Sequence, residues 1–465
     1  MVSFAQVPLA NFTPGVHLEV DYSGVPGGAQ LRGVLIVGYG GSGDSEVPTP
    51  VLGSVSPFER GSQITAMINA YRRIDPVAPI TAVALQEPAG GTAATGTITI
   101  TGTATADGSI VAYVAGKAIT VGVSVGDDAT TVAGNLADAI LADPDIPATA
   151  GNAAGVVTVT AGFLGSEGNR IPVAVDPKDD QAGVAGITAA VVAMSGGAGQ
   201  ADVASGISSI AGEAYYSVVS GLTDGTALTA LIAEMTRRHD ATVQLLGHAF
   251  GGIDGSFAEM VTEADAYNSI FLTLMGSGES LTPAWEWAAQ AAAHDTRKAD
   301  PATGYLALAM SGLDAPLVAD RPDKGERDTL LAGGVSTFRV SGSRVVLDSL
   351  ETTRSEDAQG FSDSTLLPLT LQRTGEFLRG NLRQRLALKL QNFKLASADD
   401  VIARSGQRIL TPGTARAELV AWFVEMRDGF GLVQNLPAFQ EALVVQVNAG
   451  DAGRLDAYVP TELIR

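Results

Sequence analysis

Residues 33–43 read GVLIVGYGGSG, in which four apolar residues run into a glycine-rich loop. The glycines match the spacing G-x-G-x-x-G, which in dinucleotide-binding proteins wraps a pyrophosphate at the start of a helix. No helix can start directly here, because Pro48 and Pro50 lack backbone donors and restrict the residues before them. The chain also has 55 glycines, so a chance match is expected. We therefore interpret the stretch as a buried strand followed by a flexible loop, with a cofactor site as the alternative.

The composition limits the classes of function. The chain has 465 residues, too many for one ordinary core, which predicts several domains. Its formal net charge of −21 disfavours a nucleic-acid-binding protein, because phosphate binding depends on Lys and Arg. The absence of cysteine excludes disulfides, thiolate zinc sites and cysteine nucleophiles. Only 17% of the residues are charged, so we expect partners to cover part of the surface.

The N-terminal stretch MVSFAQVPLANFTPGV has neither the basic region nor the long apolar region of a secretory signal. No later segment approaches the roughly 18 uninterrupted apolar residues that a membrane span needs. We therefore expect a soluble protein that is not exported by the usual routes.

Hydrophobic periodicity divides the first half of the chain into two regions. Residues 16–22 alternate as a short strand, a helix is predicted after Ser62, and a second strand covers 80–85. From about 86 to 195 the composition shifts to Gly, Ala, Thr and Val, with period-two strands and one helix after Asp128. These patterns predict a small, separately folded β-rich domain inserted into the chain.

Beyond residue 199, strands and helices alternate. Strands are expected near 215–219, 243–246 and 270–274, each followed by a helical pattern. This order predicts a parallel or mixed sheet that is flanked by helices and joined by right-handed crossovers. We therefore assign the fold to a multidomain α/β and α+β class with a central mixed β-sheet.

The C-terminal part begins with a long helix that carries one continuous apolar stripe over 371–395. A second helix is predicted after Thr411, and strands near 443–447 and 454–459. Between Arg373 and Arg408 the chain has eight basic and three acidic residues. An acidic protein therefore concentrates positive charge on this helix.

Candidate catalytic groups are few. The histidines have neither the H-x-x-x-H nor the H-E-x-x-H spacing that puts two imidazoles on one helical face. The alternative to a catalytic role is a structural role at the end of a helix or strand. The histidines are His17, His239, His248 and His294. No G-x-S-x-G pentapeptide or phosphate-binding P-loop occurs, and the paired acids are typical of a solvated surface. We predict no catalytic, cofactor-binding or metal-ligating residue.

An ordered series of segments along the chain resembles one protein family. The segments are PLANFTPGVHLEVDYSGVPGGAQLRGVLIVGYGGSGDSEVPTPV, PFERGSQITAMINAYRRIDP, GVSTFRV, LETTRSEDAQGFSDSTLLPLTLQRTGEFLR, RILTPGTARAELVAWF and NLPAFQEALVVQVNAGDAGRLDAYVPTEL. Together they resemble the contractile tail sheath proteins of Mu-like bacteriophages and prophages. The resemblance covers most of the chain and is weakest in the β-rich insert. It depends on the order of the segments, because no single motif is diagnostic.

The resemblance implies a domain organisation in which the 33–43 stretch is the first core strand with its exit loop. The expected parts are an N-terminal extended arm (1–25), the first part of the sheath core (26–88), a β-rich inserted outer domain (89–198), a central α/β sheath domain (199–350), a C-terminal α/β domain facing the inner tube (351–450) and a C-terminal arm strand (451–465).

The resemblance also implies a structural protein that is not an enzyme and needs no cofactor. Copies would stack helically around an inner tail tube, and shortening of the lattice would drive the tube through the host envelope. The implied partners are further copies of the chain, the inner tail tube protein, and the baseplate and tail terminator proteins. Nucleic acid and membrane insertion are not expected. Assembly would take place in the bacterial host cytoplasm, and the product would lie in the virion tail.

Neighbouring copies would exchange terminal strands, since we expect neither arm to find a strand partner within its own chain. The residues expected to take part are Val16, Leu18, Val20, Tyr22, Leu455, Ala457 and Val459. Similar proteins usually continue past the position of Arg465 with a further apolar strand, so either the exchange at the C-terminal end is shortened or the sequence is trimmed there.

The basic helix suggests a contact with the tube. Arg379, Arg383, Arg385 and Lys389 could face an acidic inner tube, and intramolecular pairing or solvation is the alternative. For the whole chain, two other functions stay open at this stage. One is a glycan-contacting surface on the insert, and the other is a hydrolase or cofactor enzyme built on the central α/β region.

Overall fold

The computed structural model describes residues 32–464, except 42, 45, 54, 182, 241, 390–392, 397–407 and 450–453. The predicted strand over 16–22 and His17 therefore lie outside the described residues. Among the helices that are described, none is long and apolar enough to cross a membrane.

An eight-stranded mixed sheet forms the centre of the molecule, in the order β15-β14-β13-β12-β11-β1-β3-β2. The inner strands from β3 to β14 run parallel, whereas β2 and β15 are antiparallel edges. The strands are β1 (Val34–Tyr39), β2 (Thr49–Val51), β3 (Ile80–Leu85), β11 (Ser217–Ser220), β12 (His248–Ile253), β13 (Leu272–Gly276), β14 (Val335–Ser341) and β15 (Arg344–Ser349). Every residue of β1 is buried, which confirms the buried strand predicted from the glycine-rich stretch.

Helices cover both faces of this sheet. They are α1 (Gln63–Arg72), α3 (Val203–Ser208), α4 (Gly225–His239), α5 (Phe257–Ala264), α6 (Ala284–Arg297) and α7 (Lys324–Ala332). Successive residues of a strand point to opposite faces. Gly251 faces Leu228 of α4, and Gly252 lies against Ala284 of α6, so these two helices cover opposite faces. A Cβ atom on Gly252 would lie 2.1 Å from the Ala284 carbonyl oxygen, so only glycine permits this close approach.

Local signals placed several helices correctly. The Ser62 hydroxyl accepts a bond from the Thr65 amide and caps α1, and Asp128 caps α2 (Ala129–Ala142) in the same way. The strand predicted over 243–246 is wrong. Gln244 and Leu246 have φ angles of 51° and 55°, in the left-handed region that no strand residue adopts, and the strand forms over β12 instead.

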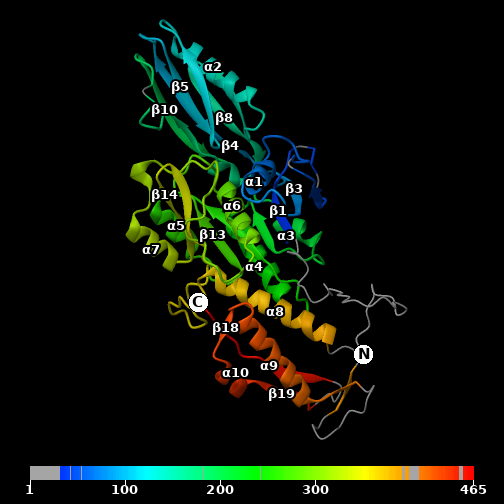
Figure 1. Cartoon of the computed structure of the whole chain (residues 1–465). Helices are drawn as coiled ribbons and strands as arrows, with labels where there is room; N and C mark the ends of the chain where they lie inside the picture. Colours follow the sequence, from blue (N-terminus) through cyan, green and yellow to red (C-terminus); the bar gives the residue numbers. More distant parts are fainter. Residues whose placement is uncertain are drawn as a thin grey trace, which may run out of the picture.

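The insert (residues 89–198) confirms the prediction of a β-rich region with one α-helix. It has a four-stranded antiparallel sheet, β10-β4-β8-β7, and a three-stranded antiparallel sheet, β6-β5-β9. Its elements besides α2 are β4 (Ala93–Gly102), β5 (Gly108–Val114), β6 (Lys117–Val123), β7 (Ala148–Ala153), β8 (Val156–Leu164), the 3₁₀ turn η2 (Ser166–Arg170), β9 (Val173–Val175) and β10 (Ile187–Ser195). Figure 1 shows the insert at one end of the molecule.

The C-terminal unit lies at the opposite end, and α8 (Leu369–Lys389) runs between it and the sheet (Figure 1). The other elements are β16 (Lys394–Leu395), β17 (Ile409–Leu410), α9 (Pro412–Asp428), β18 (Val433–Gln434), α10 (Leu436–Ala442), β19 (Val444–Val447), β20 (Leu455–Tyr458) and β21 (Glu462–Leu463). A separate hydrophobic cluster around Trp422 and Phe423 holds this unit together. Leu369 belongs to the main core and Leu378 to the second cluster, so α8 joins two cores.

Candidate functional site

The central sheet has one position where a doubly wound fold commonly binds a nucleotide. It is the crevice between β1 and β11, because the chain proceeds from these neighbouring strands in opposite directions. The buried amide of Gln63 bridges the two strand ends. Its Oε1 accepts from the Tyr39 amide (2.9 Å), and its Nε2 donates to the Gly221 carbonyl (2.8 Å). A side chain of the protein itself thus fills the position beside the glycine-rich stretch.

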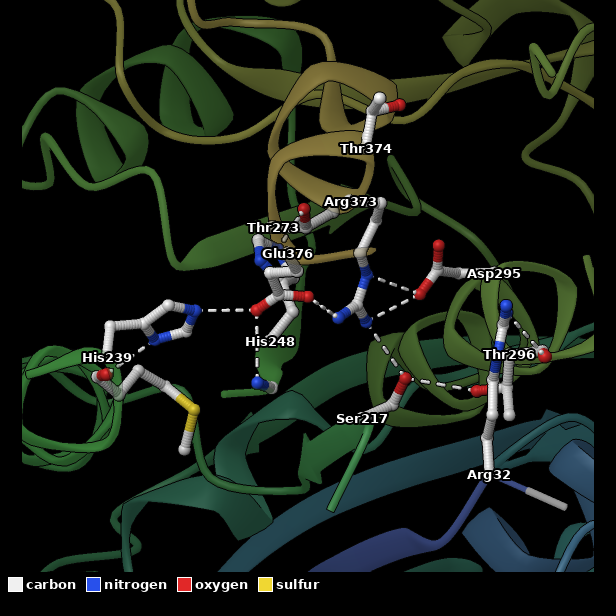
Figure 2. Close-up of polar contacts among 12 residues, drawn as sticks. Arg32, Ser217, His239, His248, Thr273, Asp295, Thr296, Arg373, Thr374 and Glu376 are labelled. Atoms are coloured by element: carbon white, nitrogen blue, oxygen red, sulfur yellow. Dashed lines mark hydrogen bonds and ion pairs between the residues drawn. The ribbon is translucent and has the colours of Figure 1, made fainter. Parts of the chain in front are cut away.

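The first turns of α8 enter the main core through a buried ionic cluster (Figure 2). The guanidinium of Arg373 donates two bonds to Asp295 of α6, at 2.9 and 2.6 Å, and a third to Glu376 at 2.7 Å. A fourth reaches the hydroxyl of Ser217 on β11 at 3.1 Å. These bonds fix α8 to both a helix and a strand of the central layer.

Glu376 connects the cluster to α4. Its Oε1 lies 2.6 Å from His239 Nε2 and accepts from the Gly247 amide at 3.0 Å. Burial alone would raise the pKa of Glu376, but the Arg373 guanidinium and the bond to His239 outweigh it and lower the pKa to about 2. His239 Nδ1 lies 2.8 Å from the Met235 carbonyl oxygen, so each ring nitrogen is within hydrogen-bond distance of an oxygen atom.

Tyr216 adds an aromatic layer to the same cluster. The guanidinium carbons of Arg32 and Arg373 lie 4.2 and 4.0 Å from its ring centroid. Arg32 also donates to the carbonyls of Thr296 and Lys298, at 3.3 and 2.7 Å. Contacts with the Tyr216 ring therefore hold the segment before β1 and the start of α8 close to each other.

The four basic residues predicted to contact a tube all lie on the second half of α8, and each has a partner within the chain. Arg379 and Arg383 donate to the carbonyls of His239 and Gln244, at 2.6 and 3.2 Å. Arg385 pairs with Glu418 (2.5 Å) and Glu425 of α9, and Lys389 lies 3.0 Å from Glu418. This half of α8 is thus bonded to the end of α4 and to α9.

The C-terminal strand corrects one expectation. We expected no partner for it within its own chain, but β20 pairs with β19 in an antiparallel hairpin. Leu455 lies opposite Val447, and Ala457 opposite Val445. Val459 packs against the second hydrophobic cluster. The prediction failed because it left out β19, which lies close to β20 in sequence, and antiparallel strands that are near neighbours in the chain pair readily.

The described histidines lie at the ends of elements. His248, at the start of β12, is 2.8 Å from the Thr273 hydroxyl, and burial lowers its pKa well below the usual value. His294, in the last turn of α6, lies 3.2 Å from the Ala309 carbonyl, and burial lowers its pKa to about 4. Over the described part of the chain, no group of three or more His, Asp or Glu residues could hold a metal ion.

Sequence reasoning missed the Arg373 cluster. The available signal was an Arg and a Glu three residues apart on one face of a predicted helix with an apolar stripe. Charged side chains that become buried in such a position need partners of opposite charge. Asp295 lies 78 residues away and has no local signature.

Comparison with known proteins settles what kind of protein carries these features. The chain is 30% identical over 476 residues to the Mu-like prophage FluMu tail sheath protein of Haemophilus influenzae, an alignment that covers 100% of this chain and 97% of the relative. The chain belongs to the phage tail sheath family. Residues 196–349 also match the phage tail sheath protein central domain. It is therefore a tail sheath protein of a contractile phage or prophage tail, a structural component of that tail and not an enzyme.

Two solved sheath tail proteins resemble this sheath subunit at lower identity. The protein from Desulfitobacterium hafniense is 12% identical with a TM-score of 0.48, and covers 97% of this chain and 100% of the other. The protein from Listeria innocua is 11% identical with a TM-score of 0.47, and covers 93% and 95%.

Proposed function

We propose that this sheath subunit polymerises helically around an inner tail tube, and that the lattice shortens to drive the tube through the host envelope. Its partners are then further copies of itself, the inner tube protein, and the baseplate and tail terminator proteins. Assembly takes place in the host cytoplasm, before the tail acts. The observation that carries this proposal is the β19–β20 hairpin, which forms a two-stranded sheet of its own.

A two-stranded sheet is marginal alone, and its outer edges can accept further strands. Among the described residues, neither β19 nor β20 pairs with a third strand. Val444 and Tyr458 lie opposite each other and are 48% and 65% exposed, so an added strand would cover apolar surface. The alternating N-terminal arm of a neighbouring copy suits this role. The proposed exchange involves Val16, Leu18, Val20 and Tyr22 of the arm, and Leu455, Ala457 and Val459 of the C-terminal strand.

The position of α8 supports a subunit in two mechanical parts. Its first half is bonded into the main core through Arg373, and its second half packs in the separate cluster around Trp422. We place the C-terminal α/β domain, with the expected bounds 351–450, against the inner tube. A displacement of the C-terminal unit would then reach the central sheet along one continuous helix. Packed helices transmit such movements because their interfaces resist gradual deformation.

We further propose that the basic face of α8 (Arg379, Arg383, Arg385 and Lys389) contacts an acidic inner tube. Arg383 is exposed, and the side chain of Lys389 is 52% exposed, so both can meet an external carboxylate in addition to their internal partners. The side chain of Arg385 is only 15% exposed, which limits its share of the contact.

Electron microscopy of the purified full-length chain tests the proposal. Tubes or long cylinders are expected, and a chain shortened by residues 451–465 should form only short or irregular pieces because its hairpin is lost. The matched control is the exposed substitution Arg60→Ala on the central part, which should assemble as the parent does. A full-length chain that stays a compact monomer at high concentration would contradict the proposal.

A further inference from the structure

The insert contacts the central sheet at the crevice between β1 and β11. The contact begins at Tyr39, the last residue of β1 and part of the glycine-rich stretch. Its ring stacks on Phe163 of β8, with centroids 4.8 Å apart. A Cβ atom on Gly165, whose φ is +124°, would lie 2.5 Å from the Tyr39 hydroxyl, so glycine is required for this approach. The strand that resembles a cofactor motif therefore serves as a surface against which the insert packs.

Directly after Gly165, the turn η2 places a carboxylate above the start of α4. Glu167 is 2% exposed, and its Oε1 accepts from the amides of Thr223 and Asp224, at 2.9 and 3.2 Å. These amides immediately precede the first turn of α4, where the positive end of the helix dipole favours an anion. Glu167 thus makes the contacts that an anionic ligand makes in a doubly wound sheet, although it belongs to the insert.

Arg170, one turn later, makes the reciprocal contact. Its guanidinium bonds to Asp254, just past β12, and to Glu263 of α5, the latter at 2.7 Å. Within the four residues 167–170, the insert therefore places a carboxylate at the start of α4 and a guanidinium against α5. Two contacts of opposite sign on different helices fix an orientation, which one contact cannot do.

Other ion pairs between the insert and the sheet are more exposed. Arg60 pairs with Asp145 at 2.8 Å with side chains 65% and 38% exposed, and Lys178 pairs with Asp314 at 3.0 Å with 38% and 33% exposed. Such pairs contribute little to stability because solvent screens them. Glu167 is buried and the side chain of Arg170 is only 24% exposed, so the contacts at η2 should contribute more to docking than these two pairs.

We propose that Glu167 is an internal anion that occupies the ligand position of the doubly wound sheet, and that together with Arg170 it locks the insert to the sheet as one rigid body. In a contracting lattice the insert then follows the central sheet, and the internal joint of the subunit lies at α8. That consequence rests on the proposed function, whereas the docking itself is tested on the single chain.

Hydrogen exchange of the full-length protein at pH 8 tests the docking, with Glu167→Ala as the variant. Burial raises the pKa of Glu167 to about 7, so the carboxylate is ionised at this pH. The amides of Thr223 and Asp224 should exchange about 10- to 100-fold faster in the variant, since a hydrogen bond to a charged group contributes on that order. Arg60→Ala is the matched control on the same interface and should leave these amides unchanged.

Rescue by a small anion separates the anion site from simple packing. Sodium formate should restore the protection of both amides in Glu167→Ala, whereas sodium chloride at the same concentration and neutral formamide should not. Glu167→Gln keeps the shape and one acceptor oxygen, so it should show a smaller acceleration that formate leaves unchanged. Unchanged exchange in the folded Ala variant, or acceleration that formate does not reverse, would overturn the proposal. If the Ala variant does not fold, unchanged exchange in Glu167→Gln overturns it, and accelerated exchange there supports it.

Discussion

Arg373 of α8 donates two hydrogen bonds to a single oxygen of Asp295 on α6, at 2.9 and 2.6 Å, and neither side chain is more than 1% exposed. The other oxygen of Asp295 accepts from the Tyr305 hydroxyl at 2.6 Å. The pair joins elements that are far apart in sequence and leaves neither charge without compensation. It links the central layer directly to the helix that leads to the C-terminal unit.

Arg373→Met should therefore destabilise the core strongly. The substitution leaves two carboxylates, Asp295 and Glu376, without their buried cation, and such a loss costs about 3–5 kcal/mol. Chemical unfolding followed by the fluorescence of Trp285 and Trp287, both in α6, measures the change. Arg373→Lys keeps the charge but loses the planar fork, so an intermediate loss is expected. A Met variant as stable as the parent would show that α8 is held by its apolar contacts alone.

Glu351 gives the molecule a stability that depends on pH. It is 8% exposed, its Oε1 accepts from the Ser349 hydroxyl at 2.5 Å, and burial raises its pKa from 4.5 to about 7. The folded chain therefore holds a proton that the unfolded chain releases between these two values. The contribution of Glu351 to the free energy of unfolding should therefore rise as the pH falls from 7 towards 4.5, whereas His248 and His294, whose pKa values burial lowers, contribute with the opposite sign.

Glu351→Gln tests this sign. The variant cannot ionise, so it should be more stable than the parent at pH 8, by up to about 3 kcal/mol, and equal to it near pH 5. Glu167 and Glu286 have similarly raised pKa values, so only part of the slope should disappear. Glu376 does not interfere, because its pKa is lowered to about 2 and its contribution is lost only below pH 4.5. A variant with the parent's full slope would contradict the prediction.

The sequence predicted those elements whose cause is local. The apolar run at β1 and the cap at Ser62 need only neighbouring residues, and both are present in the structure. The apolar run over 243–246 had the same local appearance as a strand. It failed because Gln244 and Leu246 adopt left-handed backbone conformations, against the local preference of these residue types.

The candidate sites were less predictable for a physical reason. Arg373 and Asp295 lie 78 residues apart, and only the tertiary fold brings them together. Glu167 likewise reaches the start of α4 across 56 residues. By contrast, the basic face of α8 was visible as a local run of Arg and Lys, although its bonds to α9 were not. Residues that form a site from distant parts of the chain share no periodicity or fixed spacing, so a single sequence cannot reveal the site.

Two neighbouring glycines of β12 provide a matched steric test. Gly252→Ala would place its Cβ atom 2.1 Å from the Ala284 carbonyl oxygen, so β12 and α6 would have to separate. We expect a loss of about 1–3 kcal/mol or more. Gly251→Ala meets only side-chain carbons at 3.3 Å or beyond, which are able to adjust, so its loss should be clearly smaller. Equal losses in thermal unfolding would mean that the approach of α6 to the sheet is not what requires glycine.

Charge reversal on α8 tests the proposed contact with the tube. In the double variant Arg383→Glu, Lys389→Glu, both substituted side chains lie toward the exposed end of the helix, so the fold should survive. Copolymerisation with the inner tube protein should weaken several-fold at low salt, and the difference from the parent should shrink at high salt because ions screen exposed charges. Lys389 also pairs with Glu418, so Glu418→Gln serves as the control that loses this internal pair while keeping the basic face. If the control weakens assembly as much as the double variant does, the basic face acts by holding α9 in place. If neither variant changes assembly at any salt concentration, the tube is bound elsewhere on the subunit.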